Sequence, residues 1–307
     1  MKVLEVSGLS KSFNYRGKTL RAVDDVCLNI APGEVVAFLG SNGAGKTTTI
    51  KMIAGLVKPD KGWVQIAGFN PHENQQAFKE LGVVLEGNRN LYWNFTPIQN
   101  LEYFGMLKGL NRRAVRNNAI ELLERFDLLA KARTQVQHLS RGMQQKLAIA
   151  VALIHQPKLL LLDEPTLGLD VEASENIKTL VSELVQEGYA ILLTTHQLDV
   201  AEELSNRVVI IHQGKIITEQ PTSKIIQQFS RSGYTIKIER ALELTQIRAL
   251  EVLGAVVQSN QDIYIQDLER LYSLLEKLKP LPIIKVEKEQ ADLTQIFLKI
   301  TRGKRYV

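Results

Sequence analysis

The clearest chemical signal in the sequence is a glycine-rich loop, Gly40-Ser41-Asn42-Gly43-Ala44-Gly45-Lys46-Thr47, which fits the pattern G-x-x-x-x-G-K-[ST]. Its glycines let successive backbone N–H groups converge on phosphate oxygens, because no Cβ stands in the way. Lys46 adds a positive charge for the β- and γ-phosphates, and the Thr47 hydroxyl can ligate Mg²⁺. An apolar run at 35–39 precedes the loop and a helical pattern follows it, as the motif requires. We therefore predict a nucleoside triphosphate site.

Two acids, Asp163 and Glu164, follow a second apolar run at 159–162. A buried strand that ends in an acid delivers its carboxylate to the C-terminal edge of a parallel sheet, where α/β proteins bind ligands. There Asp163 would hold Mg²⁺, directly or through water. Glu164 is then the candidate base for an attacking water.

A histidine and a helix start add further candidates. His196 follows the predicted strand 190–195, so we expect it at the same edge of the sheet. Ser140 can cap the helix that starts after it, and a serine and a glycine at a helix start can also bind phosphate. Capping alone explains Ser140, so the roles of Ser140 and Gly142 stay open on this ground.

The elements that must position these residues alternate between strands and helices. Near-continuous apolar strands of this kind are typical of a parallel sheet covered on both faces, so we predict an α/β core. The predicted strands are 35–39, 63–67, 81–85, 158–162 and 190–195, and the predicted helices are 47–56, 98–107, 114–126 and 141–154. The mostly helical stretch of about 88–158 predicts a helical subdomain inserted into this core.

The pattern changes after Gln220 and predicts a small α+β domain over 221–307. Its predicted strands are 234–239, 255–266 and 283–287, and its predicted helices are 244–253, 268–278 and 293–301. This segment carries 14 Lys and Arg against 10 Asp and Glu, and thus most of the net charge of +5. A solvated basic terminus explains this charge, and weak attraction to an acidic membrane surface is the alternative.

Composition excludes several classes of protein. The 307 residues are 45% hydrophobic and 23% charged, which excludes disordered and collagen-like chains. One cysteine, Cys27, excludes an internal disulfide framework and fits a reducing compartment. The apolar run 147–154 is much shorter than the roughly 18 residues that span a bilayer. Because Glu5 and Ser7 interrupt the stretch that a signal peptide would need, we expect a soluble, cytosolic chain.

Together these motifs resemble the nucleotide-binding subunit of ATP-binding-cassette (ABC) transporters, over about residues 2–220. The resemblance implies a P-loop NTPase core with an antiparallel β subdomain and a helical subdomain, within an ATP-binding domain at 1–220. It also implies that ATP binds along the loop Gly40–Thr48. Glu164 would be the catalytic carboxylate, and His196 would sense the γ-phosphate. The segment 221–307 resembles a small accessory domain of related exporter ATPases.

The resemblance further implies a head-to-tail dimer in which each site needs two chains. Leu139–Met143 matches the family's signature loop, so Ser140 and Gly142 become ligands of the partner's ATP. Asp170 matches the D-loop, which crosses between protomers, and Phe13 matches the aromatic that stacks on adenine, with Tyr15 as the alternative. The implied partners are a second cassette chain and integral membrane permease subunits. The second cassette is either another copy of this chain or a similar cassette, and no nucleic acid is expected. The implied location is cytoplasmic, peripheral on the inner face of the cell membrane. Residues 86–99 would then form the contact with the membrane partner; the alternative is that their aromatic side chains fill the core of the helical subdomain.

Two positions depart from the family's pattern. The glutamine expected after the strand 81–85 is Glu86, which we count among the Mg²⁺ ligands together with Thr47 and Asp163. A carboxylate there would strengthen the hold on Mg²⁺ yet repel the γ-phosphate; an unchanged Mg²⁺ dependence of hydrolysis in Glu86→Gln would contradict this hypothesis. The signature reads LSRGM, with Arg141 and Met143 as the changed residues. A basic residue there resembles the drug and lipid exporters whose ATPase is a separate chain.

Rival functions stay open at this point. A soluble cassette ATPase with a regulatory, ribosome-linked or DNA-linked role is the main alternative. Its relatives usually carry two cassettes or a long coiled coil, whereas this chain has one glycine-rich loop and no sustained heptads. A nucleotide-binding regulator without turnover is disfavoured by Glu164. The exporter ATPase is the prediction that the residues favour.

Overall fold

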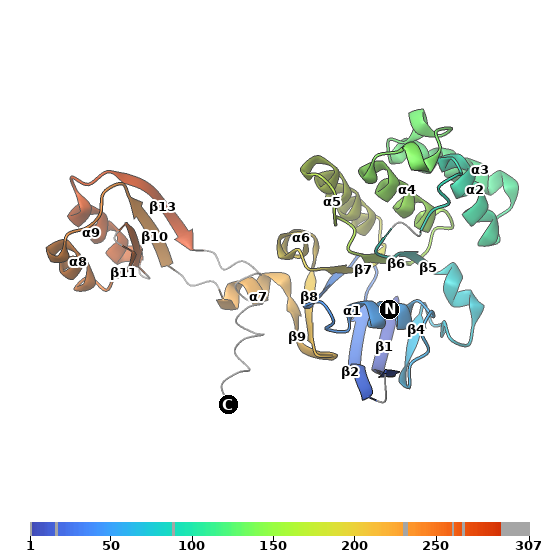
Figure 1. Ribbon diagram of the computed structural model, residues 1–307, viewed down its shortest axis with the longest axis horizontal. Helices are drawn as coiled ribbons and strands as arrows, with labels where there is room; N and C mark the ends of the chain where they lie inside the picture. The colour runs from blue at the N-terminus through green and yellow to red at the C-terminus, as the bar shows by residue number, and fades with distance from the viewer. Residues whose placement is uncertain are drawn as a thin grey trace. The chain divides into compact units, whose positions relative to one another are not determined.

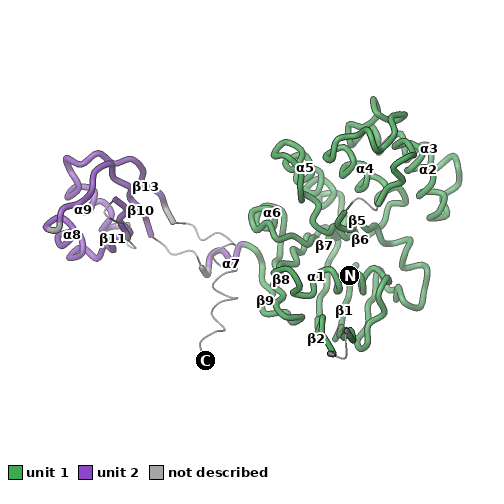
Figure 2. The backbone as a smooth tube through the Cα atoms, in the orientation of Figure 1, with its two compact units in different colours: residues 1–222 green, residues 223–307 purple. Residues whose placement is uncertain are grey.

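The computed structural model describes residues 2–15, 18–87, 90–229, 233–259, 261–265 and 268–289. The backbone forms two compact units, residues 1–222 and 223–307, which Figure 2 shows in different colours. The predicted helix at 293–301 lies outside the described residues. Of the helices in these residues, none is long and apolar enough to cross a membrane.

A six-stranded sheet forms the centre of the first unit. Its strands run in the order β5 (Leu81–Val84), β6 (Leu159–Asp163), β7 (Ala190–Thr195), β3 (Val35–Leu39), β8 (Arg207–His212) and β9 (Lys215–Pro221). All neighbours are parallel except β8 and β9. Asp163 pairs with Thr194, and Leu39 pairs with Thr195. The ends of β3, β6 and β7 therefore meet at one edge, which brings the three predicted site segments together.

The strands β3, β6 and β7 of the central sheet are buried at every position, which explains their runs of apolar residues. Leu160 and Leu162 of β6 pack into one hydrophobic cluster, and Leu159 and Leu161 pack into the other. Side chains alternate across a strand, so a strand covered on both faces needs apolar residues at every position. The predicted two-sided α/β core is confirmed.

Different layers cover the two faces (Figure 1). The helices of one face are α2 (Pro97–Leu107), α3 (Arg112–Arg125), α4 (Arg141–Leu153), α5 (Val171–Gln186) and α6 (Leu198–Leu204). The other face carries α1 (Lys46–Ile53) and an antiparallel sheet of β2 (Lys18–Ile30), β1 (Leu4–Tyr15) and β4 (Lys61–Ile66). Three short 3₁₀ helices, η1 (Gln75–Lys79), η2 (Leu129–Lys131) and η3 (Val136–His138), complete the described elements of this unit. The antiparallel subdomain that the resemblance implies is thus present.

Capping residues set the helix starts that apolar spacing places less accurately. α2 begins at Pro97, because the backbone N–H of Gln99 donates to the Thr96 hydroxyl at 3.4 Å and the Gln99 side chain accepts from the Thr96 N–H at 2.9 Å. α3 begins at Arg112, two residues earlier than predicted, because the side chain of Asn111 caps Ala114. A pattern of apolar residues does not reveal polar capping residues, so the observed helix starts lie one or two residues before the predicted ones.

The second unit is a split βαβ arrangement with the sheet order β11-β12-β10-β13. Its elements are α7 (Thr222–Phe229), β10 (Gly233–Ile238), α8 (Leu244–Glu251), β11 (Val256–Ser259), β12 (Asp262–Ile265), α9 (Leu268–Leu278) and β13 (Ile283–Glu289). The prediction of one strand at 255–266 is wrong. The backbone N–H groups of Gln261 and Asp262 both donate to the Ser259 hydroxyl, at 3.3 and 3.1 Å, and the chain reverses there. Serine and aspartate favour such turns, but the apolar alternation on both sides hides this one.

Two half-buried bases join the helical layer to β5. The Lys108 ammonium donates to the carbonyl oxygens of Phe78 and Leu81, at 2.7 and 3.2 Å, and His155 Nε2 lies 3.0 Å from the Leu81 oxygen. Burial lowers the pKa of Lys108 to about 8. Burial, with the nearby charge of Lys108, lowers the pKa of His155 to about 4, and His155 Nδ1 has no hydrogen-bond partner among the described residues. His155 is therefore neutral at pH 7.

We expect His155 to make the fold sensitive to acid. Its pKa is lower in the folded chain than its ordinary value of 6.5, so unfolding takes up a proton and stability falls as the pH drops from 6.5 to 4. The loss should reach up to about 3 kcal/mol below pH 4. His155→Gln, which keeps a donor for the Leu81 oxygen but does not titrate, should flatten this part of a urea-unfolding series against pH. The matched control is His138→Gln at an exposed position; equal slopes in wild type and His155→Gln would contradict the assignment.

Candidate nucleotide site

The glycine-rich loop joins β3 to α1 at the sheet edge described above. Lys46 is the first residue of α1, and its ammonium donates to the carbonyl oxygen of Gly40 at 2.6 Å and to that of Ser41 at 3.4 Å. The loop thus curls around the lysine side chain, which is 7% exposed. Ser41, Asn42 and Gly43 lie at the surface, where their backbone can face a ligand.

Two of the glycines are required by close backbone contacts. A Cβ on Gly45 would lie 2.5 Å from the carbonyl oxygen of Ala22, and φ of Gly45 is +111°, a conformation that side chains disfavour. A Cβ on Gly40 would lie 2.6 Å from the oxygen of Ile211. The loop therefore packs closely between β2 and β8, and this packing holds its conformation without a ligand.

Three of the predicted residues meet at the ends of β6 and β7. Asp163 is 3% exposed and accepts a hydrogen bond from the Thr194 hydroxyl. Glu164 has a φ of +52°, and its N–H donates to the Thr194 carbonyl at 2.9 Å. Its carboxylate lies 2.8 Å from His196 Nδ1 and accepts from the His196 backbone N–H at 3.3 Å. The tight turn after β6 therefore holds Glu164 against His196 rather than in solvent.

A cavity of about 540 Å³ brings the phosphate loop and the acids together. Its lining includes Ser41 to Thr48 together with Glu86, Asp163 and Glu164. Phe13 lies at the other end of the lining and is 40% exposed, with the Lys11 ammonium 5.7 Å from its ring centre. The cavity falls in the size range of small-molecule sites. One end offers backbone amides and a lysine for phosphates, and the other offers a ring for a base.

The charges in this cavity act on Lys46. Burial lowers the pKa of Lys46, while the carboxylates of Glu164, Asp163 and Glu86 oppose that shift. An anionic ligand would restore favourable charge pairing for the ammonium and would also need a cation to balance the acids. The electrostatics thus suit a phosphate ligand that arrives with a metal ion.

Five predicted residues lie outside the lining of the nucleotide cavity: Gly40, His196 and three residues at the starts of α4 and α5. Ser140 is the N-cap of α4 and accepts from the Met143 N–H at 3.2 Å. Asp170 is the N-cap of α5 and accepts from the Ala173 N–H at 2.8 Å. Gly142 lies against Ala173, since a Cβ there would be 2.8 Å from the Ala173 Cβ. The starts of α4 and α5 are thus side by side, and none of the three residues lines the cavity that holds Lys46.

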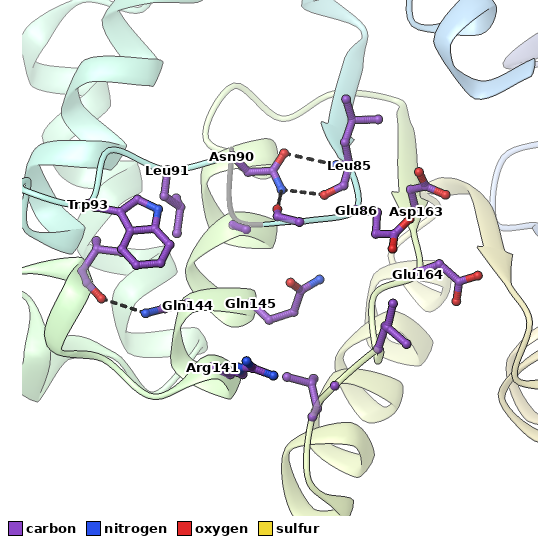
Figure 3. A pocket seen from close by; sticks show the side chains of 16 residues that line it. Leu85, Glu86, Asn90, Leu91, Trp93, Arg141, Gln144, Gln145, Asp163 and Glu164 are labelled. Carbon is purple, nitrogen blue, oxygen red and sulfur yellow. Dashed lines mark hydrogen bonds between the residues drawn. The ribbon is translucent and has the colours of Figure 1, made fainter. Parts of the chain in front are cut away.

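A second cavity of about 300 Å³ adjoins the first and shares Glu86, Asp163 and Glu164 with it. Figure 3 shows Arg141 and Gln145 reaching from α4 toward the segment that carries the acids. Asn90 holds the loop after β5, because its side chain bonds both the N–H and the oxygen of Leu85, at 3.2 and 2.7 Å. Glu86 is exposed within this bend.

The sequence analysis missed several residues of the site. Leu20, Arg21 and Gln213 line the nucleotide cavity, and Thr194 is the partner of Asp163. Leu20 could have been found, because an antiparallel pairing of the first two strands places it opposite Phe13. Gln213 lies in the turn between β8 and β9, which the sequence analysis did not predict. The Tyr15 side chain, the alternative to Phe13, lies outside the described side chains.

Comparisons with known proteins agree with this geometry. The ABC transporter family model matches residues 23–167. The ABC transporter ATP-binding protein NatA of Bacillus subtilis is 39% identical over 216 residues, which are 70% of this chain and 88% of that protein. The daunorubicin resistance ATP-binding protein DrrA3 of Streptomyces coeruleorubidus is 30% identical over 311 residues, which are 99% of this chain and 97% of that protein.

Solved structures show the same fold. A dimeric ATP-binding cassette in a post-hydrolysis state, bound to ADP and phosphate, superposes with a TM-score of 0.65 at 28% identity. The match covers 71% of this chain and 98% of that chain. The predicted P-loop core with its antiparallel and helical parts is therefore confirmed. The chain belongs to the family of ABC transporter ATP-binding proteins and is an ATPase subunit of that family.

Proposed function

We propose that this chain powers an exporter as a head-to-tail dimer attached to integral membrane permease subunits on the inner face of the cell membrane. The observation that carries the dimer is the separation of the predicted ligands. Lys46, Asp163 and Glu164 line one cavity, whereas Ser140 and Gly142 do not line it. A second copy, placed with its α4 start over this cavity, would complete the site.

Support for export comes from the relatives. The full-length match to DrrA3, a protein named for daunorubicin resistance, spans both compact units of this chain. Nod factor export ATP-binding protein I of Cupriavidus metallidurans is 35% identical over 91% of this chain. The proposal assigns residues 1–220 to ATP binding and 221–307 to an accessory role in the same complex.

The proposed chemistry is hydrolysis by an attacking water, with Glu164 as base. His196 orients the Glu164 carboxylate through two contacts, one from the ring and one from the backbone N–H. Phe13 stacks on the base, and the loop Gly40–Thr48 binds the phosphates. The turn with positive φ at Glu164 aims its side chain at the edge of the cavity that Lys46 also lines.

The residues present fit Mg²⁺. The Thr47 hydroxyl and the Asp163 and Glu86 carboxylates line one cavity, and such oxygens are the ligands that Mg²⁺ prefers. Within the described part of the chain, no group of three or more His, Cys, Asp or Glu residues could hold a metal by itself. Nucleotide phosphates and waters would complete the coordination, as is usual for this ion. When bound, the ion neutralises charge on the phosphates.

The test is ATP hydrolysis by the purified chain across a range of protein concentrations. If two chains form each site, activity per chain should rise with concentration until the dimer saturates, because the active species is the dimer. Sedimentation with and without ATP should show the dimer over the same range. Activity strictly proportional to concentration, with a monomer in sedimentation, would contradict the two-chain site.

A further inference from the structure

The second cavity adjoins the place where the γ-phosphate would be cleaved. Its acid wall, Glu86, Asp163 and Glu164, is shared with the nucleotide cavity. Arg141 and Gln145 line it from α4, four residues apart and therefore on the same face of that helix (Figure 3). The cavity thus has carboxylates contributed by β6 and the loop after β5, and a guanidinium and an amide contributed by α4.

The guanidinium of Arg141 is available to a ligand. It forms no hydrogen bond or ion pair with any residue that the structure describes. A Cβ on Gly168, which has a φ of +73°, would lie 3.3 Å from Arg141 Nη1, so the glycine leaves room for this side chain. The neighbouring Gln144, by contrast, is occupied, since its amide donates to the oxygens of Val136 and Leu139 at 3.0 and 3.1 Å.

The ligand chemistry follows from this lining. An arginine fork with five donors binds oxyanions such as phosphate in a bidentate manner, and the Gln145 amide can add a further bond. The volume of about 300 Å³ is at the lower end for small-molecule sites, which favours a compact ion over a nucleotide. The shared carboxylates would repel an anion that stays against them and so favour the side of the cavity that carries Arg141.

We propose that this cavity binds the inorganic phosphate that hydrolysis releases, with Arg141 as its principal ligand and Gln145 as the second. In the reaction the water oxygen bonds to the γ-phosphorus, the bond to the β–γ bridging oxygen breaks, and ADP keeps that oxygen with its electron pair. The proton of the water passes to Glu164. The phosphate is then formed beside the shared acids and moves toward Arg141. This inference rests on the proposed position of ATP along Gly40–Thr48.

The experiment measures inhibition of steady-state hydrolysis by inorganic phosphate, together with the KM for ATP. In Arg141→Gln the inhibition constant for phosphate should rise about tenfold or more, the effect of losing one charge-assisted pair. The KM for ATP should rise by a smaller factor than the inhibition constant for phosphate. Arg141 does not line the nucleotide cavity of its own chain, although the proposed dimer places the start of α4 near the partner's ATP. Arg141→Lys, which keeps the charge but not the fork, should lie between the two. Arg116→Gln, at an exposed position of α3, is the matched control and should behave like the wild type.

Three results would overturn the inference. They are a wild type that phosphate does not inhibit, an unchanged inhibition constant in Arg141→Gln, and a KM for ATP that rises as much as the phosphate constant. The last result would place Arg141 over a nucleotide instead. Failure of the proposed function is separate, because it would appear as full turnover in Glu164→Gln. A thermal melt of each variant excludes unfolding, and Arg141→Lys keeps the test valid if Arg141→Gln does not fold.

Discussion

Glu164→Gln should lower the ATP turnover number by about 10²–10⁴-fold, the usual contribution of a general base. The amide has nearly the shape of the carboxylate and can still accept from the His196 N–H, but it cannot take a proton from water. ATP binding should persist, because the phosphates are bound by the loop that surrounds Lys46 rather than by Glu164. Steady-state hydrolysis and direct nucleotide binding measured on the same sample separate the two effects.

The control for this prediction is Glu124→Gln, which neutralises an exposed acid on α3. It should hydrolyse ATP like the wild type, so that a loss in Glu164→Gln cannot be attributed to net charge. Wild-type turnover in Glu164→Gln would show that the base lies elsewhere. Loss of ATP binding together with turnover would show instead that the Glu164–His196 pair shapes the binding site.

Lys46→Met should weaken ATP binding by about 10–100-fold, since it removes one charge-assisted contact to the phosphates. The methionine keeps an unbranched apolar stem in a position that is 7% exposed, so packing is preserved. Burial of the ammonium lowers the pKa of Lys46, which means that burying this charge lowers the stability of the folded chain. The unliganded melting temperature should therefore not fall. The increase in melting temperature that ATP produces should shrink or disappear.

Lys51→Met is the matched control, because Lys51 is exposed on the same helix. Its thermal shift with ATP should equal that of the wild type. A full ATP-induced shift in Lys46→Met would rule out the phosphate loop as the main binding determinant. A fall in the unliganded melting temperature would instead indicate that the bonds from Lys46 to Gly40 and Ser41 stabilise the fold by more than burial costs.

Much of the fold was predictable because local chemistry determined it. The runs at 35–39, 159–162 and 190–193 are apolar at every position, which is typical of a sheet buried on both faces, and the structure has β3, β6 and β7 there. The strand at 255–266 was mispredicted because apolar alternation continues through a short polar turn. The helix α7 was also missed, although it follows the predicted change of pattern directly.

The candidate site divides in the same way. The spacing of Gly40, Gly45 and Lys46 carries its own chemistry, because phosphate binding by a loop uses backbone groups that adjoin in the chain. Contacts between distant segments carry no such local signal. The bond from Thr194 to Asp163 and the pairing of His196 with Glu164 each join residues about thirty positions apart, and they depend on β6 and β7 being neighbours.

The sequence by itself determined the phosphate loop, the acids that follow β6 and the two-sided sheet, since each depends on residue types at short spacing. Only the tertiary structure decided that Glu86, Asp163 and Glu164 are shared by two cavities, and that Arg141 borders the second. The physical reason is that a cavity is formed by the packing of α4 against the sheet edge. Its walls come from segments that no local pattern connects.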